Sequence, residues 1–274
     1  MIPRRVAIGL AVACFLLLLG LAVTAPEHLA MPDLSKVYLG FADAPPFGTD
    51  QRGRPLLEYA QQGASVILGP ALLAGAAVGF MGIVGGLLRC VGSARVDTGV
   101  QAFSEIVGSL PRMVVILVVA LLIPAGSRGL LPLALAWSVL ASPGAMDEAA
   151  SVAERLGGAR FVEALRAHGF SWSRVFLYHI TWLNLRPVVA RQGAETAMQV
   201  TFLEIALSYL AAQENQSSFT HADDVKSWAN LLEIGYPSLV LPGVHTSHAL
   251  ITGLALVALV TLMTVMTTSA ARAR

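Results

Sequence analysis

The sequence predicts an all-α fold, a polytopic bundle of about six helices that cross a membrane. Hydrophobic residues make up 55% of the 274 residues, charged residues make up only 13%, and the mean hydropathy is +0.68. A soluble domain carries about a quarter charged residues. The apolar residues also fall into runs close to the roughly 20 residues that a helix needs to cross the hydrocarbon core. The composition therefore excludes an ordinary soluble domain, and a net charge of +1 gives no reason to expect a nucleic-acid partner.

The apolar runs place the predicted spans along the chain. They cover residues 6–24, 64–88, 103–124, 129–143, 188–212 and 244–268. The first run is longer than the core of a typical signal peptide, so we interpret it as a retained helix. We expect residues 1–62 to form an N-terminal helix with an extracytoplasmic segment. Residues 63–274 are expected to form a five-helix core with a cytoplasmic loop at 144–184.

The basic residues predict the orientation, because cytoplasmic segments carry an excess of Lys and Arg. With the N-terminus inside, most arginines fall in cytoplasmic segments. The outer segments would hold only Lys36, Arg52, Arg54, Arg128 and Lys226. Both termini are therefore expected in the cytoplasm, in agreement with an even number of spans.

Glycine and proline predict how the spans pack and where they bend. Gly75 and Gly79 form a G-x-x-x-G pair in the second span, which permits close helix approach. Pro111 is expected to kink the third span. The fourth span is predicted to stop at residues 142–144, where Ser, Pro and Gly follow one another.

The fifth span carries two carboxylates, and an ionisable residue inside a membrane is a functional candidate. Arg191 lies one turn before Glu195 and can neutralise it, whereas Glu204 has no evident partner on its own helix. Thr201, Glu204 and Ser208 share a small, polar face. This face is interpreted either as part of a path or gate, or as a site of structural hydrogen bonds to a neighbouring helix.

The segment at 161–180 differs from the rest of the chain because it is basic and amphipathic. Phe161, Val162 and Leu165 recur at helical spacing, and Gly169 follows as a residue able to take φ > 0 just past a helix end. Ser171 can cap a second short helix. We expect two short helices joined by a glycine turn, although a solvated loop helix would show the same pattern.

This segment also resembles a known motif. Glu163-Ala164, Gly169 six positions after Glu163, and His179-Ile180 resemble the cytoplasmic EAA loop of permeases from bacterial ABC importers. An earlier string at 148–150 imitates the motif, but Glu154 stands where the glycine should be, and we interpret it as coincidental. The segment departs from the family at 181–182, where Thr-Trp replaces Leu-Pro.

Further elements are similar to one permease type of the dipeptide, oligopeptide and nickel importers, the subunit usually written second. They are a G-T-D-x-x-G-R string at 48–54, a Gly-Ala-Ser string at 63–65, a stretch around Glu204 at 202–210 and an S-W-x-x-x-L string at 227–232. Within the string at 48–54, Asp50 can close an Asx turn onto Arg52 or Gly53. The elements stand in the expected order between residues 45 and 232.

The resemblance implies a type I ABC-importer permease fold in a bacterial inner membrane. It implies an ATPase-coupling surface made of Phe161, Glu163, Ala164, Leu165, Arg166 and Gly169. The expected partners are a homologous permease, two ATPase subunits or domains that bind ATP and Mg²⁺, an extracytoplasmic solute-binding protein and membrane lipid. The expected solute is a peptide or a related small molecule, and Glu204 with Thr201 and Ser208 would line the path or gate.

The sequence contains no G-x-x-x-x-G-K-[ST] phosphate loop, so we expect no ATP bound by this chain. No nucleophile and base stand at a recognisable spacing, and no catalytic residue is expected. Two histidine-containing groups, at 245–248 and at 221–224, lack a third ligand fixed by spacing, so no metal site is expected. The alternative function is that of a secondary transporter or a scaffold subunit of a membrane complex.

Overall fold

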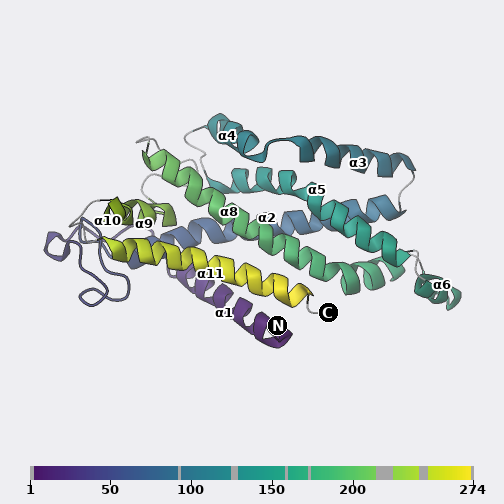
Figure 1. The fold of residues 1–274 in the computed structure, drawn as a ribbon, viewed down its shortest axis with the longest axis horizontal. Coiled ribbons are helices and arrows are strands. Elements are labelled where there is room, and N and C mark those ends of the chain that lie inside the picture. Colours follow the sequence, from purple (N-terminus) through teal and green to yellow (C-terminus); the bar gives the residue numbers. More distant parts are fainter. Residues whose placement is uncertain are drawn as a thin grey trace.

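The computed structural model of the chain is built from helices (Figure 1). It describes residues 3–91, 94–124, 129–157, 160–171, 174–213, 225–240 and 246–272. Within these ranges there is no β-strand, and only an isolated bridge joins Thr49 to Pro55. The predicted all-α class is therefore confirmed.

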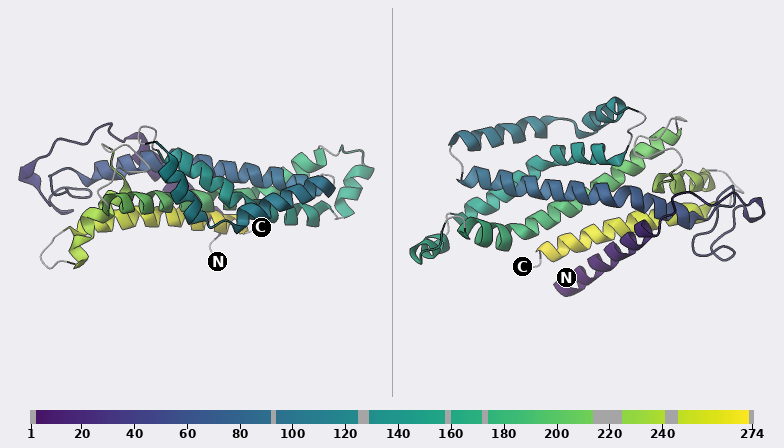
Figure 2. Two further views of the ribbon diagram at one scale, coloured as in Figure 1. Left: turned by 90° about the horizontal axis from the view of Figure 1, so that it is seen from above. Right: turned by 180° about the vertical axis from the view of Figure 1, so that it is seen from behind.

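Successive long segments run in alternating directions along the molecule (Figures 1 and 2). The elements are α1 (Arg4–Val23), η1 (Leu34–Lys36), α2 (Leu56–Val91), α3 (Ala94–Ser109), α4 (Arg112–Leu122), α5 (Leu130–Gly157), α6 (Arg160–Ala167), the π-helix η3 (Val175–Leu185), α8 (Arg186–Gln213), α9 (Trp228–Gly235), α10 (Pro237–Val240) and α11 (Ser247–Arg272). The segment between α1 and α2 lies at one end with α9 and α10, and α6 lies at the opposite end.

The described helices fit a membrane protein. Within the described ranges, four are long and apolar enough to cross a membrane, namely α1, α2, α5 and α11. The pair α3 and α4 would add a fifth if the two form one broken span. Helix α8 is also long, with 28 residues, but Arg191, Glu195 and Glu204 make it more polar than the others.

Pro111 does more than kink the third predicted span. Helix α3 ends at Ser109, α4 begins at Arg112, and the two are bent by 81°. Pro111 has an extended backbone with φ −70° and ψ 99°, because its ring cannot donate to a helical hydrogen bond and restricts the residue before it.

The predicted stop at 142–144 is wrong, because α5 continues through Pro143 to Gly157. A proline inside a helix leaves the carbonyl of the fourth preceding residue without its N–H donor. Here that carbonyl belongs to Val139, and the Ser142 hydroxyl donates to it at 2.8 Å. This substitution of a side-chain donor explains why the helix passes the proline. The predicted boundary at 62/63 likewise falls inside a continuous helix, α2.

Helix α2 packs against both α5 and α8, and small residues bring its backbone close to theirs. A Cβ added at Gly75 would lie 2.6 Å from the carbonyl oxygen of Gly193 in α8. One added at Gly86 would lie 2.6 Å from the Cβ of Ala149 in α5. The close approach expected from Gly75 and Gly79 is confirmed, and α2 forms the centre of the packing.

We predict that Gly75→Ala destabilises the protein, because the new methyl group forces the α2 and α8 backbones apart, at a cost of about 1–3 kcal/mol. The measurement is the thermal unfolding midpoint of the purified chain in detergent. Gly69→Ala is the matched control, because a Cβ at Gly69 meets nothing within 4 Å. Equal midpoints for the two variants would contradict the packing described here.

Candidate functional site

The segment predicted to form two short helices lies at the extreme end of the molecule, and α6 is the first of the two. Helix α6 lies beyond the end of α5 (Figures 1 and 2). Glu163 and Ala164 are exposed, and Leu165 is half-buried. The side chains of Phe161 and Arg166, which the sequence also assigns to this surface, lie outside those that the structure describes. The segment thus presents a short amphipathic helix away from the bundle.

Gly169 makes the turn between the two helices. Its φ is +83°, so the predicted positive φ is confirmed. The N–H of Phe170 donates to the carbonyl of Leu165 at 3.1 Å, the bond that closes a Schellman motif after a helix. A Cβ at Gly169 would meet nothing within 4 Å, so its backbone conformation, and not a lack of space, requires glycine here.

The second helix is longer than predicted. The N–H of Arg174 donates to the Ser171 hydroxyl at 3.4 Å, as expected for a cap. The π-helix η3 then runs from Val175 to Leu185 and continues without a break into α8 at Arg186. The Asn184 side chain donates to the His179 carbonyl at 2.6 Å within it. The segment that holds α6 is therefore connected to α8 through the π-helix η3, which forms one continuous helix with α8.

Helix α8 forms one wall of an apolar groove. The groove has a volume of about 610 Å³ and lies between α4, α5, α8, α9 and α11. Its walls include Met113, Trp137, Phe202, Tyr209 and Tyr236, and none of its described lining residues is charged. The Trp137 indole donates to the Gln199 side-chain oxygen at 3.0 Å within it. The groove therefore combines aromatic walls with one polar pair.

Sequence reasoning selected the other face of α8. Glu204, Thr201 and Ser208 are all buried, and none of the three lines the groove. The Ser208 hydroxyl donates to Glu204 Oε1 at 2.8 Å, so the expectation that Glu204 lacks a partner on its own helix is wrong. The groove face was recognisable from Gln199, which is followed at helical spacing by Phe202, Ala206 and Tyr209.

Glu148, in the string interpreted as coincidental, has a structural role. It lies inside α5 and accepts hydrogen bonds from Arg191 and, at 2.6 Å, from the Gln192 amide. The expected pair between Arg191 and Glu195 is also present, but at 3.9 Å. These contacts fasten α5 to α8 close to the junction where η3 ends and α8 begins.

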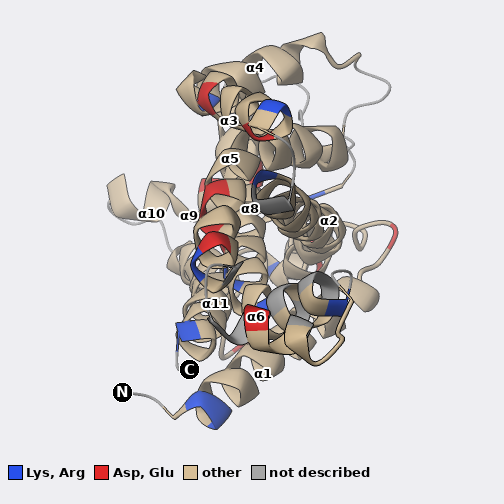
Figure 3. Cartoon of the chain, turned by 90° about the vertical axis from the view of Figure 1, so that its right-hand side faces the viewer, with Lys and Arg blue, Asp and Glu red and all other residues tan. Residues whose placement is uncertain are grey.

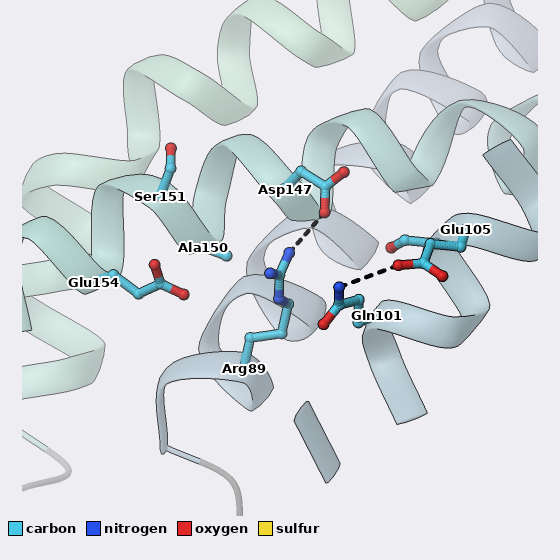
Figure 4. A pocket seen from close by; sticks show the side chains of 8 residues that line it. Arg89, Gln101, Glu105, Asp147, Ala150, Ser151 and Glu154 are labelled. Carbon is cyan, nitrogen blue, oxygen red and sulfur yellow. Dashed lines mark hydrogen bonds and ion pairs between the residues drawn. The ribbon is translucent and has the colours of Figure 1, made fainter. Parts of the chain in front are cut away.

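A second pocket of about 410 Å³ lies between α2, α3 and α5 (Figure 4). Arg89 Nη1 is 2.6 Å from an oxygen of Asp147, and its Nε is 3.3 Å from Asp97. The Gln101 amide donates to Glu105 at 3.1 Å. Arg89 thus joins the end of α2 to both α3 and α5.

The G-T-D-x-x-G-R string forms a tightly hydrogen-bonded turn at the opposite end. Asp50 Oδ1 accepts the N–H groups of Arg52 at 2.7 Å and Arg54 at 2.8 Å, which confirms the predicted Asx turn. Its Oδ2 accepts the Tyr59 hydroxyl at 2.6 Å. Gly48 has φ +84°, and a Cβ there would collide with the Leu39 carbonyl, so only glycine fits.

This outer segment is fastened to the helices by further polar contacts. A ring nitrogen of His248, buried at the start of α11, lies 2.9 Å from the Thr49 carbonyl oxygen. The Thr49 hydroxyl accepts from the Leu39 N–H and donates to the Lys36 carbonyl. At the surface, a hydrogen bond from the Ser35 hydroxyl, with the neighbouring Lys36, lowers the pKa of Asp33 to about 2. Asp33 thereby stays ionised as the cap of η1.

The S-W string packs onto the start of α2, far away in the sequence. The Trp228 indole donates to the Ala60 carbonyl at 3.0 Å, and a Cβ at Gly63 would collide with the Trp228 ring. The Gln62 side chain accepts from the Lys226 N–H at 2.9 Å and donates to the Pro26 carbonyl at 3.0 Å. The elements at 48–54 and 227–232 are therefore each held by hydrogen bonds near the start of α2, close to the element at 63–65, and we call these contacts the polar cluster.

Several expectations fall on residues outside the described ranges. These are His221, Asp223, Asp224 and His245, together with most of the predicted outer loop before α9. Among the residues that are described, no group of three or more His, Cys, Asp or Glu side chains is arranged to hold a metal ion.

Comparison with models of known protein families finds no match to this chain. A search among curated proteins finds no match either.

We predict that Asp50→Ala loosens the outer segment, because it leaves the buried Tyr59 hydroxyl and two backbone N–H groups without their acceptor. Each unsatisfied group costs about 1–3 kcal/mol. The measurement is limited proteolysis of residues 26–55 together with the thermal unfolding midpoint. Asp43→Ala, at an exposed position in the same segment, is the control. Unchanged proteolysis of the Asp50 variant would contradict the role assigned to this carboxylate.

Proposed function

We propose that the chain is a permease subunit of an ATP-driven ABC importer for peptides or a related small solute. It would form half of a translocation path and couple to separate ATPase subunits. Six spans, with α3–α4 as a broken third and α8 as a polar fifth, and both termini in the cytoplasm of a bacterial inner membrane, are part of this proposal. Its basis is the sequence resemblance, and the structure adds three observations that support it.

The observation that carries the proposal is the pair α6 and η3 with Gly169 between them. A short amphipathic helix held beyond a membrane bundle gains little from the bundle itself, so its apolar positions favour a partner that provides a groove. Glu163 and Ala164 are exposed at that place. In the proposal, this surface docks on an ATPase subunit, and Phe161 and Arg166 complete it.

The groove beside α8 supports a path for a solute. Phe202 is 43% exposed and Met113 is 59% exposed, although both belong to an apolar face on a helix bundle. We propose that a second, homologous permease covers this face and that the solute passes between the two chains. Gln199 offers a hydrogen-bonding amide to a peptide group, while the uncharged walls bind weakly enough to release it. Glu204, Thr201 and Ser208 lie on the opposite, buried face of α8. In the proposal, they hold the helix in the rotation that turns its other face toward the groove.

The polar cluster at the other end supports a rigid outer face. The segment 26–55 and α9 are held by hydrogen bonds in which Asp50 and Gln62 accept and the Trp228 indole donates. In the proposal, an extracytoplasmic binding protein delivers solute there. A fixed surface lowers the conformational entropy lost on such docking.

We predict that Gly169→Val abolishes coupling to the ATPase while the chain still inserts into the membrane. Valine at φ +83° is strained by about 1–3 kcal/mol, so η3 would leave its register relative to α6. The measurements are co-purification of an ATPase subunit with the tagged chain and solute-stimulated ATP hydrolysis by the purified complex.

Gly169→Asn is the matched control, because asparagine tolerates the left-handed conformation. The asparagine variant should retain coupled hydrolysis. Two variants with equal hydrolysis would overturn the role of this turn, and failure of the wild-type chain to bring down any ATPase would overturn the proposed function.

We predict that Ala206→Trp blocks transport without disrupting assembly, because the indole fills the groove from an exposed position. Transport by the variant would be measured as the uptake of a labelled dipeptide into cells. Uptake of a nickel chelate would be measured separately. Leu210→Trp is the control, since Leu210 is 53% exposed on the same helix and does not line the groove. Uptake by the Ala206 variant equal to that of the control would contradict a path at this face.

A further inference from the structure

A third cavity lies where α1 begins, α8 begins and α11 ends. Its volume of about 350 Å³ falls within the roughly 300–1,000 Å³ of small-molecule sites. Arg4 and Arg186 line it together with small and apolar residues, among them Ile8, Val12 and Ala190. None of its described lining residues is acidic. It is separate from both the groove beside α8 and the coupling surface.

Arg4 stands at the beginning of α1, and Arg186 lines the same cavity from the junction of η3 and α8; in a bilayer crossed by α1, this would be the level of the headgroups. Arg4 is the first residue of α1 and Arg186 the first of α8. Figure 3, which views the molecule from this end, shows basic residues at the start of α1 close to the end of α11. The small residues Ala7, Ala11 and Ala270 pack α1 against α11 there, so the two chain ends form one wall of the cavity.

The apolar side of the cavity continues along the exposed face of α1. Ile8, Val12, Leu16 and Leu19 follow one another at helical spacing, and they are 45%, 49%, 57% and 37% exposed. Such a stripe on an apolar helix at the outside of the bundle is covered by acyl chains in a membrane. A ligand with a negative head and apolar tails would thus meet arginines at one end and this stripe below them.

We propose that this cavity binds an anionic phospholipid, with the phosphodiester between Arg4 and Arg186 and an acyl chain along the Ile8–Leu19 stripe. Basic pockets between membrane helices select anionic headgroups by charge, while apolar contact retains the tails. Arginine suits this role because its planar guanidinium forms paired hydrogen bonds to phosphate oxygens. The inference requires only that α1, α8 and α11 lie in a bilayer, and it does not rest on the proposed transport function.

The test measures retained lipid by native mass spectrometry. The full-length chain, with any subunits that co-purify, is incubated in detergent with phosphatidylglycerol and phosphatidylcholine of identical acyl chains. We expect selective retention of phosphatidylglycerol. In the Arg4→Gln/Arg186→Gln variant, the amount of retained phosphatidylglycerol should fall roughly tenfold or more. The control variant Arg95→Gln/Arg155→Gln removes the same charge from exposed positions outside the cavity. This variant should retain phosphatidylglycerol.

A second variant keeps the charges and removes the space. Ala190→Trp fills the cavity from an exposed position and should lower phosphatidylglycerol retention while the arginines remain. Soluble glycerol 1-phosphate should not compete with the lipid. Equal retention of phosphatidylcholine, unchanged retention by both cavity variants, or full competition by glycerol 1-phosphate would each overturn the proposal, the last by indicating a simple phosphate site.

Discussion

The close approach of α2 to its neighbours is the constraint on which the bundle depends. Lipid tails are as apolar as leucine, so burial alone gives helices no reason to meet in a membrane, and contact between backbones takes its place. Gly75 faces α8 at Gly193, and Gly86 faces α5 at Ala149. This contact fixes the rotation of α8. Because Gly193 faces α2, the positions that follow it at helical spacing, Glu204 and Ser208, are buried, and the opposite positions face the groove.

Polar interactions then act at the two ends of this small-residue packing. At one end, Arg89 and Arg191 join α2, α3, α5 and α8 through Asp97, Asp147 and Glu148. At the other, the polar cluster around Asp50, Gln62 and Trp228 fastens the segments between the helices. Charged groups are expensive in the hydrocarbon region, so concentrating them at helix ends keeps the middle of the bundle free for apolar contact.

The local features that depend on few residues were predictable from the sequence. The positive φ of Gly169 and the Asx turn at Asp50 could be predicted because each depends only on one residue and its neighbours. The end of α5 was not predictable in this way. A sequence rule takes Pro143 as a helix stop, but the hydroxyl of Ser142 replaces the backbone donor that the proline lacks. The groove beside α8 was not predicted either. The two faces of α8 are both mixed in polarity, and only the contact with α2 decides which of them is buried.

The continuity of η3 and α8 explains how distant parts of the chain can be mechanically connected. A flexible linker between the α6 turn and α8 would absorb any displacement of α6, whereas a continuous helical rod transmits rotation and translation along its axis. Gly169, whose φ is +83°, lies between α6 and η3 and therefore contributes to the angle between them. Rotation of α8 about its axis would exchange its groove face, with Phe202 and Ala206, for the face that carries Glu204. That face is already buried against the bundle, so such a rotation would break its packing.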